Sequence, residues 1–423
     1  MACGKTNKAK IEGLAMSSVL DVDFVRSQFP AFSEPSLQGQ AFFENAGGSY
    51  TCAPVIDRLT RFYTERKVQP YAPYPASTLG GEEMDEARTR VSAMLGVDED
   101  ELSFGPSTTQ NAYVLSQAFR EWMNEGDALV VTDQDHEANS GPWRRLADAG
   151  IEVREWKIDP TTGLLNLDDL QALLDDRVRL VCFPHCSNIV GAINPVKEVV
   201  EAVHAAGAYA CVDGVSYAPH GFPNVAELGA DIYFFSSYKT YGPHQGIMVV
   251  RRALAELLPN QGHWFNGASL SKKFTPAGPD HAQVAACAGM VDYVDALAQH
   301  HGIAGGSAER AAGVHDMMRA HETQLLQPLL DYVADKNSVK LIGPSEAHSK
   351  APTVAIDLPG SGEAAAAELA KHGIMTGGGD FYGSRPLQAM GVDLEKGVLR
   401  VSFVHYTTKA EVDQLLGALD AEL

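Results

Sequence analysis

The chain has few cysteines and no long apolar run. Among its 423 residues only six are cysteine, at positions 3, 52, 182, 186, 211 and 287. They are too scattered for a disulfide framework, and Cys182 and Cys186 have no second pair with which to complete a metal site. No stretch approaches the roughly 20 apolar residues of a membrane-spanning helix. These absences predict a reduced, cytoplasmic protein with no membrane segment and no metal.

Positive charge is also scarce. Lys and Arg total 33 against 54 Asp and Glu, which gives a formal net charge of −21. A surface of that sign repels phosphate backbones and anionic lipids, so we expect neither nucleic acid nor membranes as partners. Hydrophobic residues make up 45% of the chain, enough for a large core. The balance favours a soluble enzyme for small molecules.

Several common motifs are missing. There is no GxxxxGK[ST] and no HExxH, and the run Gly377–Gly379 lacks the spacing of a dinucleotide fingerprint. Residues 1–16 lack the apolar centre of a signal peptide. We expect them to form a disordered extension, with Met16 as an alternative start.

Apolar strands alternate with helical stretches from about residue 85 to 300. The predicted strands are Leu102–Phe104, Ala128–Thr132, Ile151–Ile158, Val178–Pro184, Ala208–Asp213, Asp231–Ser236 and Gly246–Val250. The predicted helices are Gln110–Trp122, Leu167–Leu174, Val196–Ala205 and Asn224–Leu228. This alternation predicts a mainly parallel sheet covered on both faces.

The pattern changes after about residue 300. Long helices are predicted over Ala308–Ala334, followed by strands Val339–Leu341, Thr353–Asp357 and Val398–Phe403 and by helices Gly362–His372 and Lys409–Ala421. We therefore expect a large domain over residues 41–300 and a small α+β domain over 301–423. An N-terminal segment, residues 17–40, should pack with the small domain.

A lysine and an aspartate stand at the ends of two predicted strands. Lys239 follows Phe234–Ser237, and Asp213 ends Ala208–Asp213. A partly desolvated lysine is a free nucleophile near neutral pH. An aspartate that reaches the ring nitrogen of pyridoxal phosphate keeps that ring protonated and able to accept electrons.

Other polar residues follow strands or interrupt them. Thr108 and Thr109 stand at a predicted helix start, where hydroxyl and N–H groups suit a phosphate. His136 follows a strand and could stack on a planar cofactor, and Asn188 could bind a ligand carboxylate. Arg400 interrupts an apolar strand, which predicts an anionic partner: a substrate carboxylate or, alternatively, a carboxylate of the protein.

Together these segments resemble the class V aminotransferase family of fold-type I pyridoxal phosphate enzymes, and within it the cysteine desulfurase and selenocysteine lyase group. The matching segments are Phe42–Gly48, Asp135–Trp143, Ser187–Val196, Val212–Gly214, Ser236–Pro243 and Arg400–Thr408. The resemblance implies a large domain with a mainly parallel seven-stranded sheet sandwiched by helices, plus a smaller α+β C-terminal domain.

The resemblance also implies a role for each matching residue. Lys239 would hold pyridoxal 5'-phosphate as a Schiff base and move protons, with Asp213 on the ring nitrogen and His136 over the ring. Thr108, Thr109, Ser236 and Tyr238 would bind the phosphate and Ser216 the phenolic oxygen. Arg400, Asn188 and Asn45 would bind the substrate. The family is usually homodimeric, with Trp264–Pro279 reaching the partner's cofactor.

One departure from the family bears on the reaction. Persulfide-forming relatives carry a cysteine in the loop that corresponds to residues 374–386, and this chain has none there. Cys52 is the one other cysteine expected anywhere near the site. We therefore expect desulfurase-like C–S or C–Se lyase chemistry on a small amino acid. An aminotransferase or an epimerase is the alternative, and a pyridoxal phosphate-binding protein without turnover is a further one.

Overall fold

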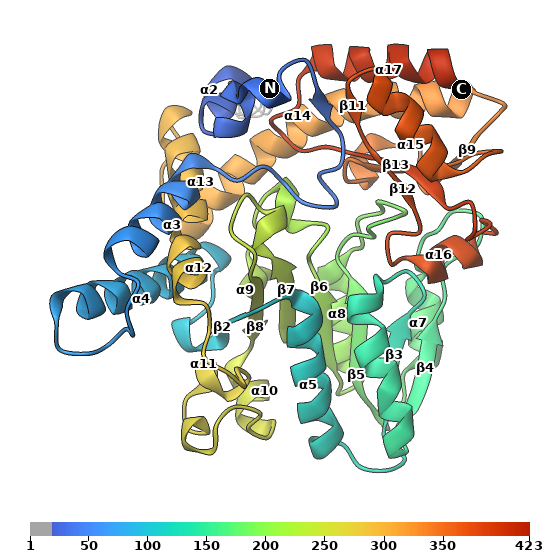
Figure 1. The fold of residues 1–423 in the computed structure, drawn as a ribbon. Helices are drawn as coiled ribbons and strands as arrows, with labels where there is room; N and C mark the ends of the chain where they lie inside the picture. Colours follow the sequence, from blue (N-terminus) through green and yellow to red (C-terminus); the bar gives the residue numbers. More distant parts are fainter. Residues whose placement is uncertain (1–18) are drawn as a thin grey trace, which may run out of the picture.

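The computed structural model describes residues 19–423, so the expectation for residues 1–16 lies outside it (Figure 1). The centre is a seven-stranded sheet in the order β2-β8-β7-β6-β5-β3-β4. Its strands are β2 (Leu102–Gly105), β3 (Ala128–Thr132), β4 (Glu152–Trp156), β5 (Val178–Pro184), β6 (Tyr209–Asp213), β7 (Ile232–Ser236) and β8 (Gly246–Val250). Strands β3 to β7 pair in parallel, and β8 is antiparallel to β7 and β2. The expected α/β architecture is confirmed.

Both faces of this sheet are buried. Along β3, Ala128 and Val130 belong to one apolar cluster and Leu129 and Val131 to another, because successive side chains of a strand point to opposite faces. Every residue of β3 is buried. A strand with no solvated face needs apolar residues at every position, which is why the sequence shows continuous apolar runs here.

Helices cover the two faces. The predicted ones are α5 (Thr108–Trp122), α7 (Leu167–Leu173), α8 (Val196–Ala205) and α9 (Val225–Leu228). The short helices α6 (Gly141–Arg144), α10 (Arg252–Leu257) and α11 (Leu270–Lys273) lie between strands or after them. Figure 1 shows a further group on one side: α3 (Ala53–Glu65), α4 (Pro75–Leu95), α12 (His281–Ala286) and α13 (Ala288–His300).

The C-terminal part has its own four-stranded antiparallel sheet. Its order is β12 (Gly377–Gly379), β13 (Val398–Ser402), β10 (Thr353–Asp357) and β9 (Lys340–Ile342). The helices here are α14 (Ser307–Asp335), α15 (Gly362–Lys371), α16 (Ser384–Ala389) and α17 (Lys409–Glu422). Helix α14 is one continuous element of 29 residues with Pro328 inside it. Among residues 19–423, no helix combines the length and apolar character needed to cross a bilayer.

The N-terminal segment lies against the C-terminal elements. Helix α2 (Val22–Ser27) carries Arg26, which forms an ion pair with Glu411 at 2.9 Å. Strand β1 (Ala41–Phe42) pairs in parallel with β11 (Ile374–Met375). The turn after β1 is thereby placed beside β13, where Ser402 Oγ accepts a hydrogen bond from the N–H of Ala46 at 2.9 Å.

Candidate active site

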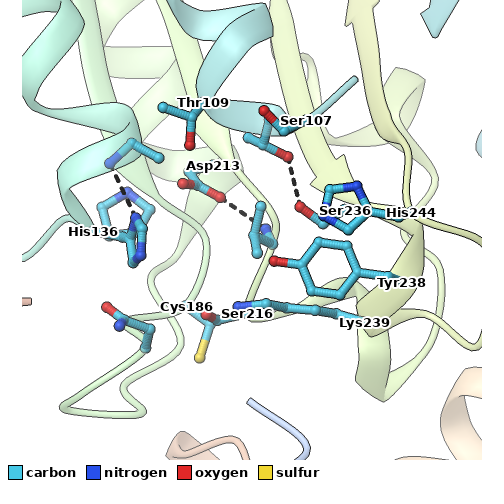
Figure 2. A pocket seen from close by; sticks show the side chains of 15 residues that line it. Ser107, Thr109, His136, Cys186, Asp213, Ser216, Ser236, Tyr238, Lys239 and His244 are labelled. Carbon is cyan, nitrogen blue, oxygen red and sulfur yellow. Dashed lines mark hydrogen bonds between the residues drawn. The ribbon is translucent and has the colours of Figure 1, made fainter. Parts of the chain in front are cut away.

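The candidate site lies where several parallel strands end. Asp213 is the last residue of β6, Ser236 is the last of β7, and His136 follows β3. Carboxyl ends of parallel strands meet at one edge of a sheet, which is where open α/β sheets bind ligands. Figure 2 shows these side chains around one space, the cofactor cavity. It has a volume of 80 Å³ and is lined by Ser107, Thr108, Thr109, His136, Ala138, Pro184, Cys186, Asn188, Asp213, Val215, Ser216, Ser236, Tyr238, Lys239 and His244.

Lys239 lies in the tight turn Ser237–Lys239 directly after β7. The residue is 8% exposed, and its carbonyl accepts a hydrogen bond from Ser49 Oγ at 2.7 Å. Burial, and then the charge of Arg400, lower the pKa of the amine to about 8, although Asp213 and Glu44 act in the opposite direction. A useful fraction of the amine is therefore a free nucleophile near neutral pH.

Asp213 is buried beside that amine. Its Oδ1 accepts a hydrogen bond from the N–H of Val215 at 2.8 Å. Burial raises the pKa of the carboxyl to about 6, while the Val215 N–H and the charge of Lys239 lower it. A poorly solvated carboxylate that is still ionised at neutral pH suits a protonated ring nitrogen.

His136 offers an uncharged ring to the same cavity. Burial, with further contributions from Lys239 and Arg400, lowers the pKa of the imidazole to about 3. Its Nδ1 accepts a hydrogen bond from the N–H of Ala138 at 3.0 Å, which places the ring proton on Nε2. A neutral, flat ring can stack on an aromatic cofactor.

Hydroxyl groups and a helix start form the other end of the cavity. Ser107 caps α5 by accepting a hydrogen bond from the N–H of Gln110, and α5 continues for 15 residues. Thr108 Oγ1 and Ser236 Oγ are 2.8 Å apart, and Tyr238 stacks on His244 at 4.7 Å. Apart from Lys239, no Lys or Arg of the described chain lines this cavity. A phosphate here would be held by hydroxyl groups, N–H groups and the helix dipole.

These residues fit the cofactor that the resemblance implies. One cavity holds an amine, a carboxylate, a neutral ring and a hydroxyl-rich cradle, which are the groups that pyridoxal phosphate requires. Ser216 lines it as well. The sequence predictions for Lys239, Asp213, His136, Thr108, Thr109, Ser216, Ser236 and Tyr238 therefore converge in space.

Arg400 lies in a wider adjoining space, the substrate cavity. This cavity has a volume of 520 Å³ and is lined by Glu44, Ala46, Gly47, Thr109, Tyr113, His136, Glu137, Ala138, Asn188, Tyr238, Lys239, Phe381, Tyr382 and Arg400. Arg400 is 3% exposed, and its Nη2 donates to Glu44 Oε1 at 2.7 Å. Its guanidinium carbon is 3.7 Å from the centre of the Phe381 ring. The protein carboxylate that the sequence left as an alternative partner is thus present.

The two asparagines predicted to bind substrate differ in position. Asn188 lines both cavities, and its Nδ2 donates to the carbonyl of Phe381 at 3.0 Å. Asn45 lines neither of them. Its Nδ2 donates to the carbonyls of Phe42 and Ser402 at 3.4 Å, and its Oδ1 accepts from the Tyr406 hydroxyl. The Asn45 amide thus ties the turn after β1 to the C-terminal strand.

Neither Cys186 nor Cys52 offers a thiolate near neutral pH. Cys186 lines the cofactor cavity, but burial raises the pKa of its thiol to about 12. Cys52 is buried under the start of α3, burial raises its pKa to about 12 as well, and it lines neither cavity. Within residues 19–423, no group of three or more His, Cys, Asp or Glu could hold a metal ion.

Sequence reasoning gave no role to five charged or aromatic residues of the substrate cavity: Glu44, Tyr113, Glu137, Phe381 and Tyr382. A pairing of Glu44 could have been predicted from the sequence. It is the one charged residue after the apolar residues Phe42 and Phe43, and its charge is opposite to that of Arg400, the one charged residue of its own apolar strand. Phe381 and Tyr382 had none, because a loop of unknown shape brings them to the cavity.

Comparisons with known proteins agree with this geometry. The family profile described as aminotransferase class-V matches residues 41–415. An aminotransferase-like protein of Gibberella zeae is 33% identical over 419 residues, covering 96% of this chain and 100% of that protein. A cysteine desulfurase of Yersinia pseudotuberculosis is 28% identical, covering 94% and 97%. The fold is similar to that of a cysteine desulfurase from Thermococcus onnurineus, with a TM-score of 0.82, 23% identity and coverage of 94% and 97%.

Proposed function

Because the chain belongs to the aminotransferase class-V family, whose members use pyridoxal phosphate, we propose that it is a lyase that breaks a carbon–sulfur or carbon–selenium bond in the side chain of an amino acid. The observation that carries the proposal is the pairing of Lys239 with Asp213 in one cavity. Burial moves the pKa of Lys239 to about 8 and that of Asp213 to about 6, so the protonation of each group changes close to neutral pH.

Each residue has a task in this reaction. Bound pyridoxal phosphate supplies an electron sink beside the substrate α-carbon. Asp213 would hold the ring nitrogen, His136 would lie against the ring, and the hydroxyl groups and N–H groups at the start of α5 would hold the phosphate. Arg400 binds the substrate carboxylate and so fixes which bond at the α-carbon stands ready to break. Lys239 Nζ, as a free amine, would accept the α-proton of the substrate and could return it.

Within residues 19–423, neither cavity is lined by a thiol that ionises near neutral pH, and this shapes the proposal. No cysteine occurs in residues 374–386, and the thiols of Cys186 and Cys52 are kept protonated by burial. Sulfur transfer through an enzyme persulfide needs a thiolate. Loss of a thiol from the β-carbon of the substrate needs none, and the products are the thiol, pyruvate and ammonia.

The first test is covalent trapping. Borohydride reduction of the protein loaded with pyridoxal phosphate, followed by peptide mapping, should find a pyridoxyl group on Lys239. The Lys239→Ala variant should lose turnover entirely, while Lys197→Ala, at an exposed lysine, should keep it. Trapping at another lysine, or normal activity of Lys239→Ala, would refute the assignment.

The second test separates reaction classes. Pyruvate and a free thiol released from S-alkylcysteines identify the lyase. A keto acid that keeps the substrate side chain identifies an aminotransferase, which the Gibberella zeae relative gives reason to examine. Exchange of the α-proton with inversion identifies an epimerase, and a visible spectrum that no amino acid changes identifies a binding protein without turnover.

A further inference from the structure

Charge does not balance in the substrate cavity once a substrate is bound. Arg400 carries one positive charge, and Glu44 already holds it at 2.7 Å. The incoming α-carboxylate needs the same guanidinium. The second oxygen of Glu44, Oε2, is shielded from solvent and has no hydrogen-bond partner within the described chain. A shielded carboxylate oxygen without a donor is costly, and the Arg400 guanidinium would be shared between Glu44 and the substrate carboxylate, so a further positive group would be favoured in the bound state.

A second carboxylate lies in the same cavity. Glu137 follows His136, and its side chain is about half exposed. Its Oε2 lies 3.4 Å from Arg385 Nε, and both side chains of this ion pair are partly exposed to solvent. Pairs of this kind are weak and exchange partners easily. The positive side chains that line the cavity in the described chain are Lys239 and Arg400, and both already have roles.

Aromatic rings make up much of the remaining wall. Phe381 stacks on Arg400, while Tyr113 and Tyr382 are 42% and 73% exposed. Faces of Tyr and Phe attract ammonium and guanidinium groups within about 6 Å. Carboxylates beside open aromatic faces form a lining suited to a cation, and they disfavour a second anion.

The size of the cavity agrees with a long side chain. Part of the 520 Å³ lies beside Lys239 and His136, where the cofactor belongs, and the rest extends to Tyr113, Glu137 and Tyr382. A side chain longer than that of cysteine has further lining residues to contact here.

We propose that the substrate side chain ends in an ammonium or guanidinium group that Glu137 and the neighbouring tyrosines bind. The added positive charge offsets the negative charge of Glu44, which shares Arg400 with the substrate carboxylate. This inference rests on the proposed function. Glu137 is then a specificity-determining residue of the substrate cavity.

The test uses a matched pair of substrates with the loaded enzyme. S-(2-aminoethyl)cysteine and S-propylcysteine have side chains of equal length, and only the first is cationic. The same β-elimination takes up one water and gives a thiol, pyruvate and ammonia from either compound. We expect kcat/KM for pyruvate release to be several-fold higher for the aminoethyl compound, as expected for a partly exposed ion pair supported by an aromatic face.

Variants locate the effect. Glu137→Gln should remove most of the preference by raising KM for the aminoethyl compound, with little change for the propyl compound. Glu121→Gln, at an exposed glutamate of α5 outside both cavities, should keep the preference.

A binding measurement keeps the inference separate from the reaction class. Lysine and norleucine, titrated into the loaded protein and followed by its visible spectrum, should differ several-fold in apparent dissociation constant in favour of lysine. Equal constants, or equal kcat/KM for the two cysteine derivatives, would overturn the cationic side chain and leave the proposed function intact. Failure of borohydride to label Lys239 would instead overturn the proposed function itself.

Discussion

At the scale of single residues, burial acts on Lys239 and Asp213 in opposite directions. Loss of water disfavours the charged form of both groups, so the pKa of the amine falls and that of the carboxyl rises. Each partly restores the other's charged form, because the two charges are opposite. The pKa values of both groups therefore lie within about one unit of neutral pH, although both groups are buried.

The pKa of Lys239 predicts how cofactor attachment depends on pH. Only the free amine attacks the cofactor carbonyl, and the folded pKa of about 8 lies below the ordinary 10.5. The attachment rate of the cofactor-free protein should rise about tenfold per pH unit below pH 8 and level off above it. Stopped-flow absorbance measures this rate.

Two features of the pH profile would discriminate. Asp213→Asn should shift its midpoint to lower pH, since the carboxylate favours the protonated amine. A midpoint near 10.5 in the unsubstituted protein would show that Lys239 is solvated and unperturbed.

At the scale of elements, the loop after β12 holds two residues in left-handed backbone. Phe381 has φ 50° and Tyr382 has φ 56°, a region that costs non-glycine residues about 1–2 kcal/mol each. Hydrogen bonds from Asn188 Nδ2 to the Phe381 carbonyl and from the Glu137 N–H to the Tyr382 carbonyl hold the loop there. In this conformation Phe381 lies over Arg400, and Tyr382 lines the substrate cavity.

This strain predicts a trade between stability and binding. Tyr382→Gly should raise the free energy of unfolding by about 0.5–1 kcal/mol, because glycine relieves the backbone and the 73% exposed ring loses little burial. The same variant should bind lysine more weakly. Chemical denaturation and spectral titration measure the two effects. Tyr382→Phe, which keeps the strain, serves as the control, and a less stable glycine variant would contradict the argument.

The sequence predicted the elements that carry strong local signals. Strands β3, β5, β8 and β10 and helix α8 have the predicted bounds, because short apolar runs between polar turns leave little freedom. The pairing of β1 with β11 was not predicted, since the two strands are far apart in the chain and only two residues long. The pairing of β12 with β13 was not predicted, because β12 is a run of three glycines without a strand signal. The cofactor residues follow strand ends and could be predicted. The wall made by Glu137, Phe381 and Tyr382 depends on loop geometry that local patterns do not encode.

At the scale of the whole molecule, one surface region is unusually apolar. Trp264 and Phe265 are 88% and 65% exposed. They belong to the same stretch of chain as Phe274 and Pro276, which line a 420 Å³ cavity with mainly apolar walls. Large exposed apolar residues mark contact surfaces. The family resemblance assigns residues 264–279 to a homodimer contact.

We therefore expect a dimer in solution that depends on these two side chains. The double variant Trp264→Ser, Phe265→Ser should shift the molar mass measured by light scattering from two chains towards one. Leu257→Ser, at another half-exposed apolar residue, should leave the mass unchanged. A monomeric unsubstituted protein, or an unaltered mass for the double variant, would contradict this expectation.

Strand β1 pairs with β11, so Glu44 meets Arg400 across most of the length of the chain. During synthesis the first of these segments leaves the ribosome long before the second exists. The strands of the central sheet are all synthesised before residue 251, whereas the pair between Glu44 and Arg400 cannot form until translation is nearly over. A chain that ends before residue 400 would therefore lack the guanidinium with which Glu44 is paired.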